Sequence, residues 1–419
     1  MKKIRKAIFL TGVVQGVGMR PHIYKLAHAN NLSGFVYNNG DGVHLEVEGK
    51  TDDIDSFLKK LETKLPPLAR IDSMACHTIN TKNDNDFTIL KSPKEGLKTT
   101  LIGVDTKTCH ECLDDIRTPG RYHNYFAINC TNCGPRYTII NTLPYDRDNT
   151  AMQPFGMCPA CQEEYNNPTN RRYHAQPTSC NLCGLELSLY GMSNKIKTKN
   201  IYAEIAKEIK NGKIVAIKSI GGFHLVCDAT NDAVVGKLRK EKNRPKKPFA
   251  LMCKDITQIK KFAECNEIEE EIISSKENPI VVIKKNQHAM ISPLIAPDIH
   301  KIGVMLAPSA LHHLLFDYLN MPIVATSANL ADEPLIVSKE EILKKLPFVD
   351  CIVDHNREII NALDDSLVQV SDGKLQMLRL GRGYTPTVLK LKNKITEKIV
   401  ALGAHTKNSI AFASGDSLI

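Results

Sequence analysis

Tryptophan is absent from this chain of 419 residues, and all aromatic residues together make up only 6% of it. No run approaches the roughly 18 apolar residues that a membrane-spanning helix needs. Basic residues precede a short apolar stretch at 8–10, as in a signal peptide, but no small-residue cleavage site follows. From these absences we expect a cytoplasmic protein that binds no membrane.

The composition is that of a globular protein, with 42% hydrophobic and 24% charged residues. The length favours about three domains. A net charge of +9 favours anionic partners, which are either phosphorylated small molecules or nucleic acid. Because RNA-binding surfaces commonly stack bases on aromatic side chains, the scarcity of aromatic residues makes RNA the less favoured partner.

Eight of the thirteen cysteines form four CxxC pairs, which are Cys109/Cys112, Cys130/Cys133, Cys158/Cys161 and Cys180/Cys183. One pattern, CxxC–x(17–18)–CxxC, therefore occurs twice. Each copy supplies four thiolates, the ligand number of a closed tetrahedral Zn²⁺ site. In each copy a glycine follows the second pair, at Gly134 and Gly184, where a turn with positive φ would direct backbone N–H groups at the sulfurs. The spacing predicts two structural zinc ions.

A disulfide framework is the alternative interpretation of these cysteines. Such frameworks are typical of secreted chains, and here five further cysteines stand in apolar or helical contexts, which are Cys76, Cys227, Cys253, Cys265 and Cys351. Pairing within each copy is the simplest arrangement, although the spacing leaves crossed pairing open. His174 could also be a ligand, but with eight thiolates present we interpret it as a hydrogen-bonded histidine at an interface.

The first ninety residues alternate between strand and helix patterns in the order βαββαβ, the ferredoxin-like split unit. The expected strands are 6–13, 34–40, 43–49, 71–78 and 87–90, and the expected helices are 21–31 and 52–61. A glycine-bearing loop joins the first strand to the first helix. Such a loop offers free N–H groups and the positive end of a helix dipole, which together bind phosphate.

This loop resembles the acylphosphatase motif. The resemblance implies that Arg20 holds a phosphoryl group together with the backbone amides of a cradle formed by Gln15, Gly16, Val17, Gly18 and Met19. It also implies that Asn38, on the second strand, positions the attacking water. Met19 stands where the family more often has phenylalanine, a conservative change in packing.

A second set of polar residues lies between positions 200 and 390. A helix is expected at 201–210, and a buried strand at 214–218. The basic segment 238–250 could be a solvated helix face, but it contains two prolines and enters a strand, so its cations could face a polyphosphate. A further strand at 323–326 ends in Ser327-Ala328-Asn329, short side chains suited to bonding backbone or ligand.

Lys218, the turn Lys242-x-Arg244-Pro245 and Ser327-Ala328-Asn329 resemble the YrdC-like fold of threonylcarbamoyl-adenylate synthases, which bind ATP. The resemblance implies two roles. Lys218, Lys242, Arg244 and Arg382 would contact phosphate or carbamate anions, and Ser327 and Asn329 would hydrogen-bond nucleotide or carbamate, with His224 and Asp365 as further contacts.

Together with the acylphosphatase motif and the paired fingers, the segment Arg171-Arg172-Tyr173-His174-Ala175-Gln176-Pro177 resembles the HypF carbamoyltransferases of nickel–iron hydrogenase maturation. The resemblance implies a multidomain α+β and α/β protein. Its expected parts are a ferredoxin-like acylphosphatase domain at 1–92, a segment of two four-cysteine zinc fingers at 105–190, a YrdC-like twisted α/β domain at 198–388, and at 393–419 the start of a truncated actin-like-ATPase-type carbamoyltransferase domain. Two stretches depart from the family's pattern, the residues before His312-His313 and the run around Arg379.

The function expected from the resemblance is hydrolysis of carbamoyl phosphate to carbamate, followed by formation of carbamoyl adenylate from ATP with Mg²⁺. The carbamoyl group would go to the C-terminal cysteine of a HypE-type partner protein. Two alternatives stay open: a threonylcarbamoyl-adenylate synthase for tRNA modification, and a zinc-containing RNA-binding module.

Overall fold

The computed structural model describes residues 3–93, 101–192, 194–286, 290–330, 333–403 and 410–419. The chain folds into two compact units. Unit 1 comprises residues 1–103 and 108–186, and unit 2 comprises 104–107 and 187–419. The chain therefore leaves unit 1 for four residues, Val104–Lys107, before it returns. In the described part of the chain, every helix is too short or too polar to cross a bilayer.

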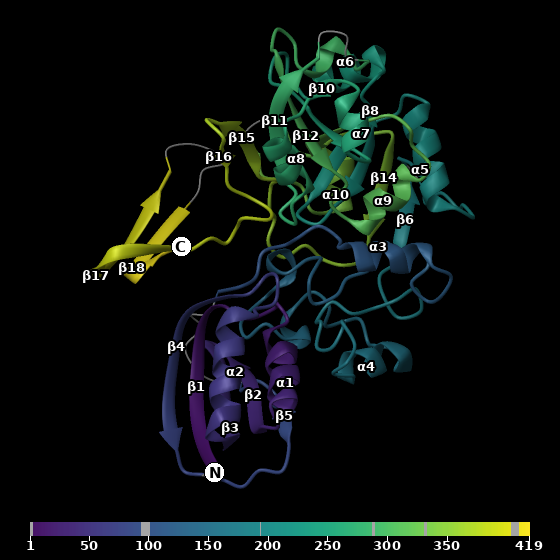
Figure 1. Ribbon diagram of the computed structural model, residues 1–419. Coiled ribbons are helices and arrows are strands. Elements are labelled where there is room, and N and C mark those ends of the chain that lie inside the picture. The colour runs from purple at the N-terminus through teal and green to yellow at the C-terminus, as the bar shows by residue number, and fades with distance from the viewer. Residues whose placement is uncertain (1–2, 94–100, 193, 287–289, 331–332, 404–409) are drawn as a thin grey trace. The chain divides into compact units, whose positions relative to one another are not determined.

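Unit 1 begins with a five-stranded sheet in the order β4-β1-β3-β2-β5 (Figure 1). The elements are β1 (Lys3–Val13), α1 (Met19–Ala29), β2 (Ser33–Asn39), β3 (Gly42–Lys50), α2 (Thr51–Thr63), β4 (Arg70–Ile79) and β5 (Phe87–Ile89). The predicted βαββαβ order is confirmed. β1 is antiparallel to both β3 and β4, whereas β5 adds to β2 in parallel.

The two helices pack on one side of this sheet because their apolar residues recur at helical spacing. In α2, Ile54, Phe57 and Leu61 are fully buried, and they join Ile8 and Leu10 of β1 in one core. A bulge interrupts β1 at Gly12, whose φ is 124°. A Cβ there would lie 2.3 Å from the carbonyl oxygen of Arg70, so only glycine fits.

The finger segment of unit 1 has short helices and little sheet. Its elements are α3 (His110–Arg117), the 3₁₀ turns at Tyr137–Ile139 and Arg147–Asn149, and α4 (Pro159–Asn166). Cys109 and Cys158 are the N-cap residues of α3 and α4, so the two copies of the cysteine pattern begin in the same structural position. Buried arginines replace part of an apolar core, since the Arg172 guanidinium lies 4.0 Å from the Tyr122 ring centroid.

Unit 2 is built on one large mixed sheet in the order β16-β15-β11-β12-β9-β13-β8-β7-β14-β6, with β10 paired to β11 (Figure 1). Its strands are β6 (Leu187–Tyr190), β7 (Val215–Lys218), β8 (Phe223–Asp228), β9 (Ala250–Cys253), β10 (Ala263–Glu264), β11 (Ile280–Lys285), β12 (Lys301–Leu306), β13 (Ile323–Ser327), β14 (Cys351–His355), β15 (Leu367–Ser371) and β16 (Lys374–Arg379). The central strands β7, β8 and β13 are almost wholly buried, as expected for strands covered on both faces.

Short helices surround this sheet. They are α5 (Ile201–Lys210), α6 (Asp232–Glu241), α7 (Ile256–Lys260), α8 (Glu267–Ser274), α9 (Ala310–Phe316) and α10 (Lys339–Lys345), with a 3₁₀ turn at Pro293–Ile295. Local sequence determines where several of them begin. Asn200 and Asn231 cap α5 and α6, and Asn266 with Glu269 forms a capping box on α8. The helix predicted at 201–210 is confirmed.

The last element is an antiparallel hairpin of β17 (Leu389–Leu402) and β18 (Ile410–Leu418), a sheet of its own (Figure 1). The predicted strand at 399–404 falls largely within β17. Ala404 and the predicted Lys407-Asn408-Ser409 stretch lie outside the described residues. Val400 and Leu402 are exposed on this hairpin.

Candidate functional site

The glycine-bearing loop of unit 1 has the conformation that an anion cradle requires. Gly16 and Gly18 have φ angles of 70° and 78°, in the left-handed region that glycine tolerates. α1 begins directly after this loop at Met19, and Arg20 lies in its first turn. The loop thus places backbone amides, a helix N-terminus and a guanidinium at one point.

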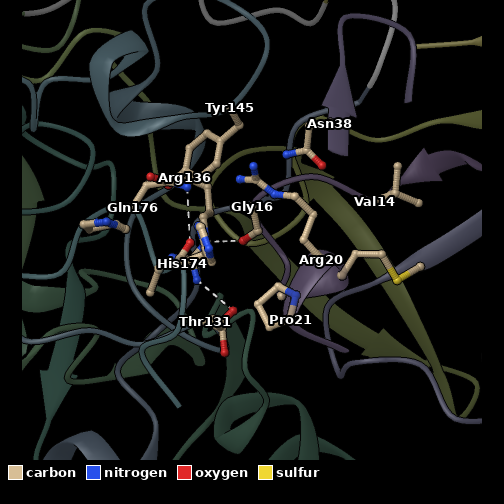
Figure 2. Close-up of a pocket in the computed structure, with 14 residues that line it drawn as sticks. Val14, Gly16, Arg20, Pro21, Asn38, Thr131, Arg136, Tyr145, His174 and Gln176 are labelled. Atoms are coloured by element: carbon tan, nitrogen blue, oxygen red, sulfur yellow. Dashed lines mark hydrogen bonds between the residues drawn. The ribbon is translucent and has the colours of Figure 1, made fainter. Parts of the chain in front are cut away.

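Arg20 is buried and contacts two side chains that are distant in sequence, Asp146 and Asn38, of which Figure 2 draws Asn38. Its Nη2 donates to Asp146 Oδ1 of the finger segment at 2.8 Å. In the amide orientation that pairs acceptor with donor, Asn38 accepts from Arg20 Nε at 3.2 Å and from Nη2 at 3.3 Å. The structure therefore brings Arg20 and Asn38 together, as the acylphosphatase resemblance predicts, and adds a carboxylate that the sequence did not suggest.

The pocket at this point is small, with a cavity of about 20 Å³. The loop supplies one side of its lining, and the finger segment supplies the other (Figure 2). Sequence reasoning missed the finger residues in the lining, which are Thr131, Arg136, Tyr145, His174, Ala175, Gln176 and Pro177. The signal for them was the density of arginine, histidine and glutamine at 171–177, which no simple linker needs.

The Gln15 side chain connects the loop both to the β2–β3 turn and to the finger segment. Its Nε2 donates to the carbonyl oxygens of Asn39 and Gly42 at 2.5 and 2.9 Å, which fixes the loop to the β2–β3 turn. Its Oε1 accepts from the backbone N–H of Tyr145 at 3.1 Å. The Gln15 side chain is therefore used for support, and the backbone of this residue forms a parallel bridge with Ile102.

His174 has an unusual backbone and environment for a non-glycine residue, with φ at 52°. Its ring packs against Tyr165 and Tyr173, with centroids 4.9 and 4.6 Å apart. Burial, with the nearby Arg20, lowers the pKa of His174 to about 4. We expected a hydrogen-bonded interface histidine; within the described residues, however, the ring makes no hydrogen bond and instead lies at the pocket.

The eight predicted ligand cysteines form two separate clusters, Cys109/Cys112/Cys130/Cys133 and Cys158/Cys161/Cys180/Cys183. Pairing within each copy is thereby confirmed. Neighbouring sulfurs lie 3.6–3.8 Å apart in the first cluster and 3.6–3.9 Å apart in the second. Disulfide sulfurs lie about 2.05 Å apart, whereas a tetrahedron with Zn–S distances of about 2.3 Å has edges of about 3.8 Å. The clusters therefore have the spacing of zinc sites.

The two knuckle glycines differ from each other. Gly134 has φ of 89°, as predicted, but Gly184 has no positive φ, so the prediction for Gly184 is wrong. Its reason for being glycine is space: a Cβ there would lie 1.9 Å from the Tyr125 hydroxyl oxygen. Arginines also reach the sulfurs, since Arg171 donates to Cys112 Sγ at 2.9 Å and Arg121 to Cys161 Sγ at 3.1 Å.

Unit 2 contains a larger pocket, with a cavity of about 240 Å³. Four of the predicted contact residues line it, which are His224, Arg244, Ser327 and Asp365. The cations Lys247, Lys301 and Arg379 also line it, together with Phe249 and Thr326. The sequence shows the 238–250 segment as basic and the run around Arg379 as a departure from the family's pattern, but it gave no signal that Lys301 of β12 would line the same wall.

One polar chain connects three of the predicted residues. His224 Nε2 lies 3.0 Å from Asp365 Oδ2, and Arg382 Nε donates to Asp365 Oδ1 at 2.8 Å. Burial alone would raise the pKa of Asp365, but Arg382 and His224 hold it well below its usual value. His224 Nδ1 is buried and has no hydrogen-bond partner within the described chain.

The other predicted residues of unit 2 lie outside this lining. Lys218 Nζ donates to the carbonyl oxygen of His355 at 3.0 Å and pairs with Asp354. Lys242 Nζ donates to the carbonyl oxygens of Ser327 and Asn329 at 2.9 and 2.7 Å. These buried lysines hold backbone in place, and Arg382 does the same at Asn278.

Arg244 is the predicted cation that faces the pocket. It donates to Thr326 Oγ1 at 3.2 Å and to backbone carbonyls of the basic turn. Burial, followed by the neighbouring Arg239 and Arg379, lowers its pKa to about 10. A cation surrounded by other cations gains from an anionic ligand, so this wall suits phosphate groups.

Family models match three separate parts of the chain. The acylphosphatase model matches residues 6–89, and the HypF finger model matches 108–140 and 157–190. A model described as telomere recombination, of the Sua5–YciO–YrdC type, matches 207–381.

The chain is 38% identical to the carbamoyltransferase HypF of Rhodobacter capsulatus over 98% of this chain and 55% of that protein. Identity to the carbamoyltransferase HypF of Synechocystis is 40%, over 97% of this chain and 54% of that protein. A crystal structure of full-length HypF in the phosphate- and nucleotide-bound form matches with a TM-score of 0.95 at 38% identity, over 100% of this chain and 55% of that one. The chain thus spans about half the length of these relatives. It belongs to the HypF family, of which it represents the N-terminal portion with the acylphosphatase, finger and YrdC-like parts.

Proposed function

We propose that this chain converts carbamoyl phosphate to carbamate in unit 1 and adenylates carbamate with ATP in unit 2. The observation that carries this proposal is the pairing of Arg20 with Asn38 beside a loop that has two left-handed glycines. A phosphoryl group needs a guanidinium fork and converging amides, and an attacking water needs an oriented acceptor or donor. This site offers both.

In the first step, Arg20 and the amides of the Gln15–Met19 cradle would hold the phosphoryl oxygens. Asn38 would orient water for attack at phosphorus, and the bond from phosphorus to the carbamoyl oxygen would break. The products are inorganic phosphate and carbamate. For the substrate to take both branches of the Arg20 guanidinium, Asp146 must give up its bond to Nη2.

In the second step, a carboxylate oxygen of carbamate would attack the α-phosphorus of ATP, and pyrophosphate would leave. Arg244, Lys247 and Lys301 line the pocket, and Arg379 lines it from another strand, so the triphosphate would meet several cations. Mg²⁺ bound with ATP would neutralise further charge on the phosphates. His224 and Ser327 are the polar groups proposed for carbamate or nucleotide contacts, with Lys218, Lys242, Asn329, Asp365 and Arg382 as supporting residues.

The two cysteine clusters would each hold one structural Zn²⁺, because four thiolates leave no position for water. As in the family's expected reaction, a HypE-type protein would be the final acceptor of the carbamoyl group. Carbamate decomposes readily in water, which favours making it and consuming it on one protein.

The test is formation of AMP and pyrophosphate from ATP with carbamoyl phosphate as the only carbamoyl source. We expect Arg20→Ala to lower this rate at least about 100-fold and added carbamate to restore it, whereas Arg244→Ala should stay inactive with carbamate. Pyrophosphate formation that needs threonine and bicarbonate instead would favour the threonylcarbamoyl-adenylate alternative. Activity of Arg20→Ala equal to that of the unaltered chain would refute the proposed first step.

A further inference from the structure

Arg136 is a buried arginine of the finger segment with only 1% of its surface exposed. Its guanidinium has five N–H donors, and each one has a backbone carbonyl as acceptor. Nε donates to Gly16 at 2.5 Å, Nη1 to Cys133 and Pro135 at 2.6 and 3.0 Å, and Nη2 to Cys130 and Thr131 at 3.0 Å each. Figure 2 shows Arg136 between Gly16 and Thr131.

These acceptors belong to two functional elements. Gly16 is in the proposed phosphate cradle, whereas Cys130 and Cys133 are the second CxxC pair of the first cysteine cluster. One side chain therefore connects the backbone of the cradle directly to the backbone of the knuckle. In this way, the position of the knuckle determines the position of the Gly16 carbonyl.

The Gly16 carbonyl matters because a trans peptide unit is planar, with its C=O and N–H directed oppositely. When Arg136 holds the Gly16 oxygen, the N–H of Val17 must point away from Arg136. That N–H is one of the amides that the cradle would offer to a phosphoryl group. Contacts limit other movements of the loop, since a Cβ on Gly16 would lie 3.1 Å from the Tyr145 ring and one on Gly18 would lie 3.2 Å from Thr131.

The contact of Arg136 with the knuckle should depend on bound metal, because the charge of the metal–thiolate cluster favours a cation beside it. Four thiolates around one Zn²⁺ carry a formal charge of about −2, which favours a buried cation nearby. Without the metal, the knuckle backbone loses the ion that fixes it. The buried position of Arg136 between the knuckle and the loop would then be less stable.

We propose that Arg136 is a positioning residue that couples the first cysteine cluster to the phosphate cradle, so that metal binding at the cluster strengthens phosphate binding at the loop. The coupling rests on the proposed role of the loop in holding a phosphoryl group. It is reciprocal, because linkage requires phosphate to raise the zinc affinity of the cluster by the same free energy. The second cluster has no such arginine among the described contacts.

The test measures inorganic phosphate binding by calorimetry and zinc release to a chelator, on the full chain. We expect Arg136→Ala to weaken phosphate binding about tenfold or more, because a hydrogen bond from a charged donor is lost at the cradle. Arg136→Lys keeps the charge but not the five-donor geometry, so it should give an intermediate affinity. Added guanidinium ion at low concentration should restore part of the phosphate affinity of Arg136→Ala.

Arg171→Ala is the matched control, since Arg171 donates to Cys112 Sγ of the same cluster but to no residue of the cradle. Its phosphate affinity should stay within about twofold of the unaltered chain. In the unaltered chain, phosphate should slow zinc release from the first cluster, a result that does not depend on how the variants fold.

Equal phosphate affinity in the unaltered chain and Arg136→Ala, with no effect of phosphate on zinc release, would overturn the coupling while leaving the proposed function in place. No phosphate binding by the unaltered chain would overturn the proposed function and this inference together. An equal loss of phosphate affinity in Arg171→Ala would also overturn it, because any disturbance of the cluster would then suffice.

Discussion

In unit 1, the loop proposed to hold phosphate contacts side chains from the finger segment, and Arg20 bonds to an aspartate 126 residues away. In unit 2, the pocket is lined by strands and turns around one sheet, and cations from separate strands line it. The first site has a cavity of about 20 Å³, and one branch of its Arg20 guanidinium already bonds Asp146, whereas the second has a cavity of about 240 Å³. The proposed site for one phosphoryl group therefore depends on supporting contacts, and the proposed site for a nucleotide depends on its volume and its cations.

Removal of the metal should give the largest difference between the two units, because it should destabilise unit 1 and not unit 2. Structural zinc supplies about 10–16 kcal/mol of binding free energy in small finger modules. We expect a strong chelator, or Cys130→Ser, to lower the unfolding temperature of unit 1, whose finger segment loses its metal, and to leave that of unit 2 unchanged. Calorimetry would show this, with exposed Cys76→Ser as the control. Loss of both transitions together would show that the units unfold as one.

Within unit 2, the burial of a cationic side chain should determine how strongly its removal weakens ATP binding. Arg244 is half-buried and has its pKa lowered to about 10, so an anion relieves its repulsion from other cations. Lys301 is exposed in the same lining. We expect Arg244→Ala to weaken ATP binding about tenfold or more and Lys301→Ala only about two- to threefold, with a stronger salt dependence for the lysine. Equal effects in a titration would remove this distinction.

In unit 1, one substitution should increase the affinity for phosphate. Asp146 occupies part of the Arg20 guanidinium that a phosphoryl group would use. Asp146→Asn keeps the size of the side chain but removes the competing charge, so we expect phosphate affinity to rise about three- to fivefold. Asp148→Asn, at a carboxylate two residues away, serves as the control. Weaker phosphate binding in Asp146→Asn would mean that Asp146 positions Arg20 for the substrate.

The smallest expected difference between the two units is in how their stability depends on pH. His174 in unit 1 has a pKa of about 4 and His312 in unit 2 one of about 3, both because burial disfavours the charged imidazole. An unfolded histidine titrates near 6.5, so below that pH the unfolded chain binds more protons and both units lose stability as pH falls toward 4. The slope is at most about 1.4 kcal/mol per pH unit for each histidine.

His174→Gln should flatten this slope for unit 1 alone between about pH 6.5 and 4. Urea denaturation at several pH values would measure it, with unit 2 as an internal reference. An unchanged slope for unit 1 would mean that His174 is protonated in the native chain.

Local patterns in the sequence predicted the elements and the cysteine clusters well. The βαββαβ order follows from alternating apolar periods, and the cysteine spacing identifies eight ligands that the fold brings into two groups. Family resemblance predicted that Arg20 and Asn38 would meet, which no local pattern could show. Gly184 was misjudged because its constraint is the Tyr125 hydroxyl, a residue far away in sequence.

The parts that sequence reasoning missed depend on long-range contacts. Arg136, Tyr145 and His174 reach the phosphate pocket only because the fingers pack on the loop, and no spacing in the chain encodes that packing. In unit 2, the family resemblance predicted that Lys218 and Lys242 contact phosphate or carbamate anions. Both lysines also donate to buried carbonyl oxygens, a contact that a one-dimensional pattern cannot distinguish from a ligand contact.

The four residues Val104–Lys107 bear on how the chain folds during synthesis. The Lys107 N–H donates to the Lys276 carbonyl oxygen, and Asp105 and Thr106 are buried in unit 2. A ribosome adds about 5–20 residues each second, so Lys276 emerges on the order of ten seconds or more after Lys107. The cysteines of both clusters are all made within that interval. The fingers can therefore bind metal during synthesis before α8 and β11, which flank Lys276, have been made and can contact this short segment.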